Sequence, residues 1–97
     1  MPIRILIVDD EPLARDTIRL LLDEQEGVEI VGEARNGDEA VSMIESMQPD
    51  LVFLDIQMPG KTGFEVIEAV GVENMPVVIF ATAYDEYALK AFDARAL

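Results

Sequence analysis

Four short runs of hydrophobic residues are separated by stretches in which hydrophobic residues recur at helical spacing. The runs are Ile3 to Val8, Val28 to Ala34, Leu51 to Leu54 and Val77 to Ala81. Between and after them, intervals of three and four residues predict helices over about 12–25, 37–48, 64–70 and 84–95. Strict alternation of strand and helix predicts an α/β fold, a doubly wound parallel sheet with right-handed crossovers and helices on both faces.

The third run, Leu-Val-Phe-Leu, shows no polar alternation, which predicts a central strand covered on both faces. We expect Val77 to Ala81 to be buried on both sides as well, and Val28 to Ala34 to lie nearer a sheet edge. No strand follows the last predicted helix. Four strands alone would leave Val77 to Ala81 as a hydrophobic edge. We therefore expect one domain, 1–97, that is truncated at its carboxyl end.

Polar residues that could bind a ligand or take part in a reaction lie where the predicted strands end. Asp9 and Asp10 follow the first strand, Asp55 follows the third and Thr82 follows the fourth. In a doubly wound sheet the first and third strands are neighbours at the switch point, so the three carboxylates should share one crevice. Their repulsion, several kcal/mol at an intermediate dielectric, favours a bound cation. Mg²⁺ suits oxygen ligands, and a carboxylate can attack phosphorus to form an aspartyl-phosphate.

Simpler interpretations exist for each residue alone. The sequence Asp9-Asp10-Glu11 is also typical of an acidic first helical turn that complements the helix dipole. Asp55 is also typical of a residue that starts a turn, and Thr82 of a polar strand end. The joint occurrence at the carboxyl ends of several predicted strands favours a functional site.

Composition narrows the chemistry further. The chain has 97 residues, no cysteine and no histidine, which excludes disulfides, thiolate chemistry and the usual zinc sites. Its formal charge is −13, with 20 acidic against 7 basic residues, so this segment should repel nucleic-acid backbones. No hydrophobic run approaches the roughly 20 residues of a membrane span, and no signal peptide is evident. We expect a cytoplasmic protein with no membrane contact.

Three segments together resemble the receiver domain of bacterial two-component response regulators. They are Ile-Leu-Ile-Val-Asp-Asp-Glu-Pro (5–12), Asp-Leu-Val-Phe-Leu-Asp-Ile-Gln-Met-Pro-Gly (50–60) with Gly63, and Phe-Ala-Thr-Ala-Tyr (80–84). The segments Glu-Pro-Leu-Ala-Arg (11–15) and 83–92 are most similar to receivers joined to a LytTR-type DNA-binding domain. The resemblance implies a flavodoxin-like (CheY-like) fold of strand order 2-1-3-4-5.

The same resemblance implies specific roles. Asp55 would accept a phosphoryl group from a sensor histidine kinase in a Mg²⁺-dependent reaction. Asp10 would bind Mg²⁺ directly, Asp9 through water and Gln57 through its backbone carbonyl. Thr82 would hydrogen-bond the phosphoryl group and act as the switch. An attached effector domain would bind DNA and regulate transcription.

The sequence departs from this family at its carboxyl end. Receivers carry a lysine at the end of a fifth strand, followed by a fifth helix. Neither Lys61 nor Lys90 lies at that position. We therefore expect this chain to retain metal binding but to accept phosphate poorly. We also expect that it could form a homodimer, with segments swapped to cover the open edge.

Three alternatives remain open at this stage. A Mg²⁺-dependent aspartyl phosphatase usually has a second acid two residues beyond its nucleophile, where this chain has Gln57. A dinucleotide-binding domain needs a glycine-rich first turn, whereas this one reads Asp-Asp-Glu-Pro. A purely structural oligomerisation module is the third. We favour a signalling domain over a turnover enzyme.

Overall fold

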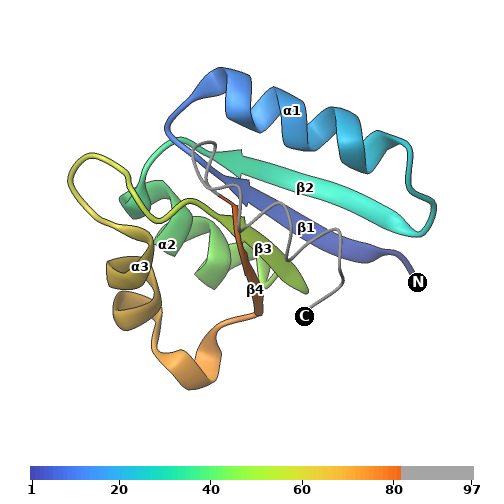
Figure 1. Cartoon of the computed structure of the whole chain (residues 1–97). Helices are drawn as coiled ribbons and strands as arrows, with labels where there is room; N and C mark the ends of the chain where they lie inside the picture. The colour runs from blue at the N-terminus through green and yellow to red at the C-terminus, as the bar shows by residue number, and fades with distance from the viewer. Residues whose placement is uncertain (82–97) are drawn as a thin grey trace.

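A computed structural model describes residues 1–81, which form a four-stranded parallel sheet with helices on both faces (Figure 1). The strand order is β2-β1-β3-β4, which confirms the predicted order for these strands. The elements are β1 (Ile3–Val8), α1 (Pro12–Asp23), β2 (Val28–Ala34), α2 (Gly37–Met47), β3 (Leu51–Leu54), α3 (Gly63–Val70), the short 3₁₀ helix η1 (Val72–Asn74) and β4 (Val77–Phe80).

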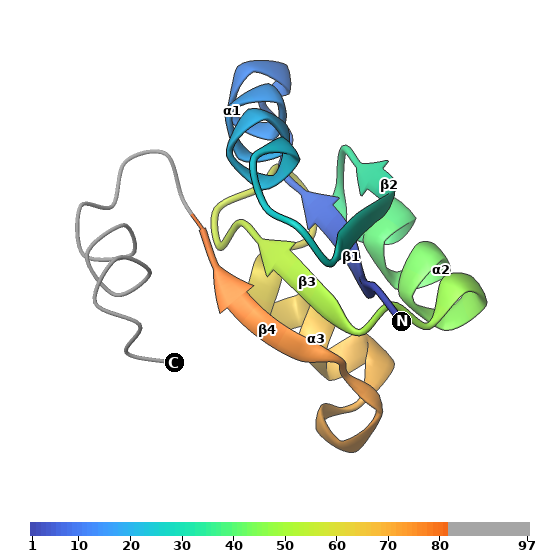
Figure 2. The ribbon, with the colours of Figure 1, turned by 90° about the vertical axis from the view of Figure 1, so that its right-hand side faces the viewer.

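Helix α1 lies on one face of the sheet, and α2 and α3 lie on the other (Figure 2). Successive side chains of β3 contribute to opposite cores, as expected for a strand with period two. Val52 and Leu54 pack in the core beneath α2 and α3, and Phe53 packs in the core beneath α1. The predicted burial of β3 on both faces is therefore confirmed.

Local sequence signals set the start of each helix. Pro12 occupies the first turn of α1, where a missing N–H costs nothing. Asn36 caps α2 by accepting a hydrogen bond from the Glu39 N–H at 2.8 Å. Thr62 and Glu65 form a reciprocal capping box at the start of α3. These caps fix where the chain turns after β2 and β3.

Helix α1 differs from the prediction in its inward face. It ends at Asp23, two residues before the expected Gln25. Ile18 and Leu22, one turn apart, pack against the sheet. Hydrophobic residues at approximate helical spacing in the sequence predict an inward stripe of Leu13, Ile18, Leu21 and Leu22. For Leu13 and Leu21 this prediction is wrong, because their side chains are 76% and 51% exposed. Leu13 lies five residues before Ile18, which places it on a different side of the helix.

The predicted burial of the fourth strand on both sides is confirmed only in part. Ile79 lies in the core beneath α1, and Val78 and Phe80 are partly buried against the core beneath α2 and α3. Val77 is 63% exposed, and only Ile79 in β4 is buried. Val77 is exposed because β4 is the outer strand of the described sheet and pairs only with β3 there. The expected helix over 84–95 lies outside the described residues. Within residues 1–81, no helix is both long and apolar enough to cross a membrane.

Candidate functional site

The register of β1 and β3 brings two buried aspartates side by side. Val8 pairs with Leu54 in the parallel ladder, so the next residue on each strand, Asp9 and Asp55, follows at the same level. The ladder continues through both residues. The Asp55 N–H donates to the Val8 carbonyl at 3.0 Å, and the Asp9 N–H donates to the Ala34 carbonyl at 3.1 Å. The backbone of the sheet therefore holds both side chains at its carboxyl edge.

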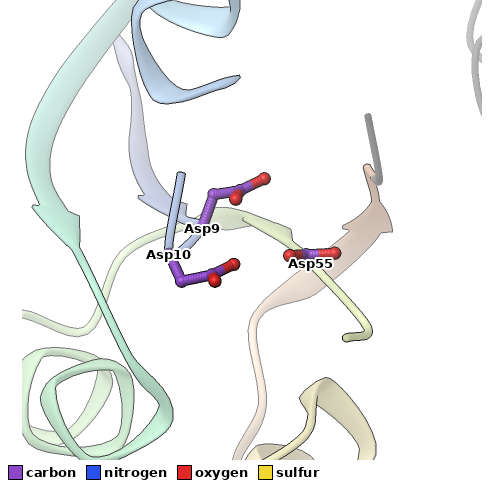
Figure 3. A group of neighbouring side chains, drawn as sticks. All are labelled: Asp9, Asp10 and Asp55. Carbon is purple, nitrogen blue, oxygen red and sulfur yellow. The ribbon is translucent and has the colours of Figure 1, made fainter. Parts of the chain in front are cut away.

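Asp10 completes a group of three carboxylates at this edge (Figure 3). One oxygen from each of Asp9, Asp10 and Asp55 can be chosen so that all three lie within 4.8 Å of one another. Asp9 is 1% exposed and Asp55 is 6% exposed, whereas Asp10 is half-buried. The expectation that these residues converge in one crevice is therefore confirmed.

Hydrogen bonds satisfy only part of this acidic group. Oδ1 of Asp9 accepts from the Glu11 N–H at 2.9 Å, but Oδ2 is buried and has no hydrogen-bond partner among the described residues. Oδ1 of Asp55 accepts from the Gln57 N–H at 3.3 Å, which is a long bond. A structural role in the following turn thus accounts for one oxygen of each aspartate. It leaves Oδ2 of Asp9 unexplained, and buried acceptors rarely lack a partner.

The alternative of an acidic first helical turn does not fit the structure. Helix α1 begins at Pro12 and has no acidic residue in its first turn. Asp9 and Asp10 lie before the helix, and the capping position belongs to Glu11, whose side chain makes no capping bond.

Burial and the charge of neighbouring carboxylates make ionisation of Asp9 and Asp55 unfavourable. Burial, followed by the neighbouring carboxylates of Asp9 and Asp10, raises the pKa of Asp55 from 3.8 to about 6. Burial also raises the pKa of Asp9, against the opposing effects of the Glu11 N–H and the positive charge of Arg15. Protons or a cation would relieve this cost.

The donor set fits a hard divalent cation. All three donors are carboxylates, and within residues 1–81 no nitrogen or sulfur ligand accompanies them, since the chain has no histidine or cysteine. Oδ2 of Asp9 is a buried acceptor with no partner in the part of the chain that the structure describes, and a cation or its bound water would satisfy it. Mg²⁺ binds through one or two carboxylates and retains several waters. Because Asp10 is only half-buried, an ion bound beside it could keep those waters on the solvent side.

The loop after Asp55 approaches the acidic group very closely at Gly63. A Cβ atom built on Gly63 would lie 2.5 Å from the Asp55 carbonyl oxygen and 3.1 Å from Cα of Ile56. The Gly63 N–H also donates to the Ile56 carbonyl at 2.9 Å. Only glycine allows α3 to begin against this backbone. The sequence marked Gly63 only as part of a family motif, and periodicity alone carried no signal for the contact.

The sequence also gave no indication of a role for Arg15, whose Nη1 donates to the Asp9 carbonyl at 2.8 Å.

Of the remaining predicted site residues, Gln57 has an exposed side chain, and its N–H contacts Asp55. The metal-binding role of its carbonyl stays a prediction. Thr82 lies outside the described residues, so its role also stays a prediction.

Comparison with known proteins identifies the class to which this fold and site belong. Residues 5–97 match the family described as the response regulator receiver domain. The chain is 36% identical, with a TM-score of 0.77, to the signal receiver domain of the putative response regulator NarL from Mycobacterium tuberculosis, over 92% of this chain and 77% of that one.

Curated relatives agree with this result. The chain is 50% identical over 94 residues to the transcriptional regulatory protein BtsR of Salmonella typhi, covering 97% of this chain and 39% of the relative. It is 46% identical over 96 residues to the sensory transduction protein LytT of Bacillus cereus, covering 98% of this chain and 39% of the relative. The chain thus spans about two fifths of the length of these relatives. It belongs to the response regulator receiver domain family.

Proposed function

We propose that this receiver domain accepts a phosphoryl group on Asp55 from a sensor histidine kinase. The observation that carries the proposal is the convergence of Asp9, Asp10 and Asp55 at the carboxyl edge of the sheet in a member of the receiver family. A strand end beside a topological switch point is where open α/β sheets bind ligands.

The ionisation of Asp55 suits a nucleophile. A carboxyl with a pKa of about 6 is mostly ionised at neutral pH, so an oxygen lone pair is available for attack. Attack on the phosphorus of a phosphohistidine would form a P–O bond to Asp55 and break the P–N bond. The bonding electrons would leave with the imidazole nitrogen, which then takes a proton. The Gln57 N–H already contacts Asp55 and helps to orient its carboxylate.

Asp9 and Asp10 would hold Mg²⁺ together with Asp55, and the backbone carbonyl of Gln57 would add a ligand. When bound, Mg²⁺ would offset the negative charge of the carboxylates and of the transferring phosphoryl oxygens. The contribution of the chain is to hold these carboxylates in position. Sheet hydrogen bonds fix the main chain at Asp9 and Asp55, and the Glu11 N–H orients the Asp9 carboxylate.

The biological output would come from a longer protein. Curated relatives that include transcriptional regulatory proteins are matched over about two fifths of their length. We propose that an effector domain binds DNA, and that phosphorylation, which adds nearly two negative charges, biases a two-state equilibrium through Thr82. A homodimer with exchanged segments at the outer side of β4 is a further proposal, supported by the exposure of Val77.

The direct test is phosphorylation of the full-length protein by a small phosphodonor, such as acetyl phosphate, with Mg²⁺. The intact mass should increase by one phosphoryl group, and no increase should occur when Mg²⁺ is chelated before the reaction. Asp55→Asn should gain none, whereas Asp50→Asn, a change at an exposed acid at the other end of β3, should behave as the wild type. An Asp55→Asn protein that gains the same adduct would assign the acceptor elsewhere.

A further inference from the structure

Arg15 connects three elements next to the acidic group. From the second turn of α1, its Nη1 donates to the Asp9 carbonyl at 2.8 Å and its Nε donates to Oε1 of Glu33 on β2 at 3.2 Å. Its side chain is only 13% exposed, which is unusual for arginine. A planar guanidinium can make two such bonds at fixed angles, and the ammonium of lysine cannot reproduce that geometry.

The bond to the Asp9 carbonyl is the more informative of the two. Asp9 follows the last residue of β1, at the point where the chain leaves the sheet for α1. Its N–H is fixed by the Ala34 carbonyl and one side-chain oxygen by the Glu11 N–H. Arg15 fixes the remaining polar group of its backbone. The peptide that joins Asp9 to Asp10 is therefore held at its carbonyl by a cationic side chain.

Arg19 provides an internal comparison. It lies one turn further along α1 and donates to Oε2 of the same Glu33 through Nε at 2.8 Å and through Nη2. Its side chain is 42% exposed, and within residues 1–81 its hydrogen bonds go to Glu33 and not to the Asp9 backbone. If the role of Arg15 were only its ion pair between α1 and β2, Arg19 would have the same role, because it pairs with the same Glu33.

We propose that Arg15 is a positioning residue for the cation site, which acts by fixing the Asp9–Asp10 peptide against Glu33. This inference rests on the proposed function, because it assumes that Asp9 and Asp10 bind a divalent cation. Groups behind the direct ligands of a metal commonly change its affinity by about 10- to 100-fold. Arg15 would affect affinity through the orientation of its neighbours and would not contact the ion.

The test is calorimetric titration of Mg²⁺ into the full-length protein and its variants, with urea unfolding to confirm that each is folded. Arg15→Ala should bind Mg²⁺ about 10-fold more weakly than the wild type. Arg19→Ala, the matched control, loses contacts to Glu33 and should stay within about 2-fold. Arg15→Lys should recover part of the loss, because lysine retains the charge and one hydrogen bond. This variant also keeps the test decisive if the alanine variant does not fold.

The outcomes separate this inference from the proposed function. If the wild type binds Mg²⁺ and Arg15→Ala binds it equally well, Arg15 has no positioning role and the cation site stands. Equal losses in Arg15→Ala and Arg19→Ala would also overturn the inference, because the effect would then come from the ion pairs with Glu33. Complete recovery in Arg15→Lys would reduce the effect to charge alone and contradict it. A wild type that does not bind Mg²⁺ would overturn both proposals.

Discussion

Asp55 combines deep burial with two neighbouring carboxylates, and this combination links its ionisation to folding. Its pKa in the folded chain, about 6, lies above the ordinary value of 3.8. Between these values the folded state binds more protons than the unfolded state, so stability falls as pH rises. The cost is fully present above the folded pKa. The difference between these two pKa values corresponds to up to about 3 kcal/mol.

We therefore predict that Asp55→Asn stabilises the cation-free protein at neutral pH and has little effect near pH 4. Urea unfolding at pH 4, 5, 6 and 7.5, in buffer with a chelator, measures the difference between variant and wild type. The difference should grow by up to about 3 kcal/mol across this range. A difference that does not change with pH would show that Asp55 does not carry the unfavourable charge. Glu45→Gln, at an exposed position on α2, is a suitable control.

At the scale of elements, the site depends on how the loop after β3 passes into α3. Gly63 is the first residue of α3 and lies against the Asp55 carbonyl. Helix propensity alone would favour alanine over glycine by about 1 kcal/mol at an unhindered helical position. The contact at 2.5 Å reverses that expectation, because backbone atoms rather than a flexible side chain would have to move.

We predict that Gly63→Ala destabilises the protein by about 2 kcal/mol and displaces the Asp55 backbone. Urea unfolding gives the first value, and the amide chemical shifts of Asp55 and Gln57 report the second. Gly60→Ala is the matched control in the same loop. Gly60 has φ of 84°, so alanine is strained by about 1 kcal/mol, but its Cβ would meet nothing within 4 Å. A stable Gly63→Ala protein with unchanged Asp55 shifts would contradict the close approach.

The capping box at the start of α3 gives a third prediction. Thr62 accepts from the Glu65 N–H at 3.2 Å, and the Glu65 carboxylate accepts from the Thr62 N–H at 3.0 Å. Thr62→Ala should lower the free energy of unfolding by about 1 kcal/mol. Thr17→Ala, which removes a hydroxyl from an exposed position within α1, should change it by less than about 0.5 kcal/mol. Equal effects would show that the cap contributes nothing special.

The sequence predicted the elements that are defined by local pattern. The order of strands and helices follows from signals a few residues long, and so do the starts of α1 near residue 12 and of α2 near residue 37. The meeting of Asp9 and Asp55 was also predictable, because parallel strands end at one edge of a sheet.

The sequence did not predict contacts between residues that are far apart along the chain but close together in space. The contact of Gly63 with Asp55 and the reach of Arg15 to Asp9 and Glu33 require three-dimensional positions. Leu13 is exposed because its angle around α1 differs from that of the inward-facing Ile18 and Leu22, and hydrophobic character alone does not indicate that angle.

The whole molecule carries a large excess of negative charge around a small sheet. Its formal charge is −13 over 97 residues, and two hydrophobic cores lie on the two sides of the sheet. Self-repulsion of this size opposes the compact state and is reduced by salt.

We predict that raising KCl from about 0.05 to 0.5 M increases the free energy of unfolding by about 1 kcal/mol, because the Debye length falls below typical spacings between surface charges. Mg²⁺ at the same ionic strength should add a further increase that saturates, since a ligand of the native state stabilises it by mass action. In Asp10→Asn the response to KCl should persist and the additional increase from Mg²⁺ should be much smaller. A Mg²⁺ effect that matches KCl at equal ionic strength would indicate screening alone.

The central claim is that three aspartates from two strand ends form a single divalent-cation site. The most direct measurement is the NMR spectrum of the protein with substoichiometric Mn²⁺, a paramagnetic ion that occupies Mg²⁺ sites. We predict selective broadening of the amide signals of Asp9, Asp10, Asp55 and Gln57, reversed by excess Mg²⁺, while those of the exposed acids Asp23 and Glu45 stay sharp. Broadening spread evenly over the surface carboxylates, with none concentrated at this edge of the sheet, would contradict the account.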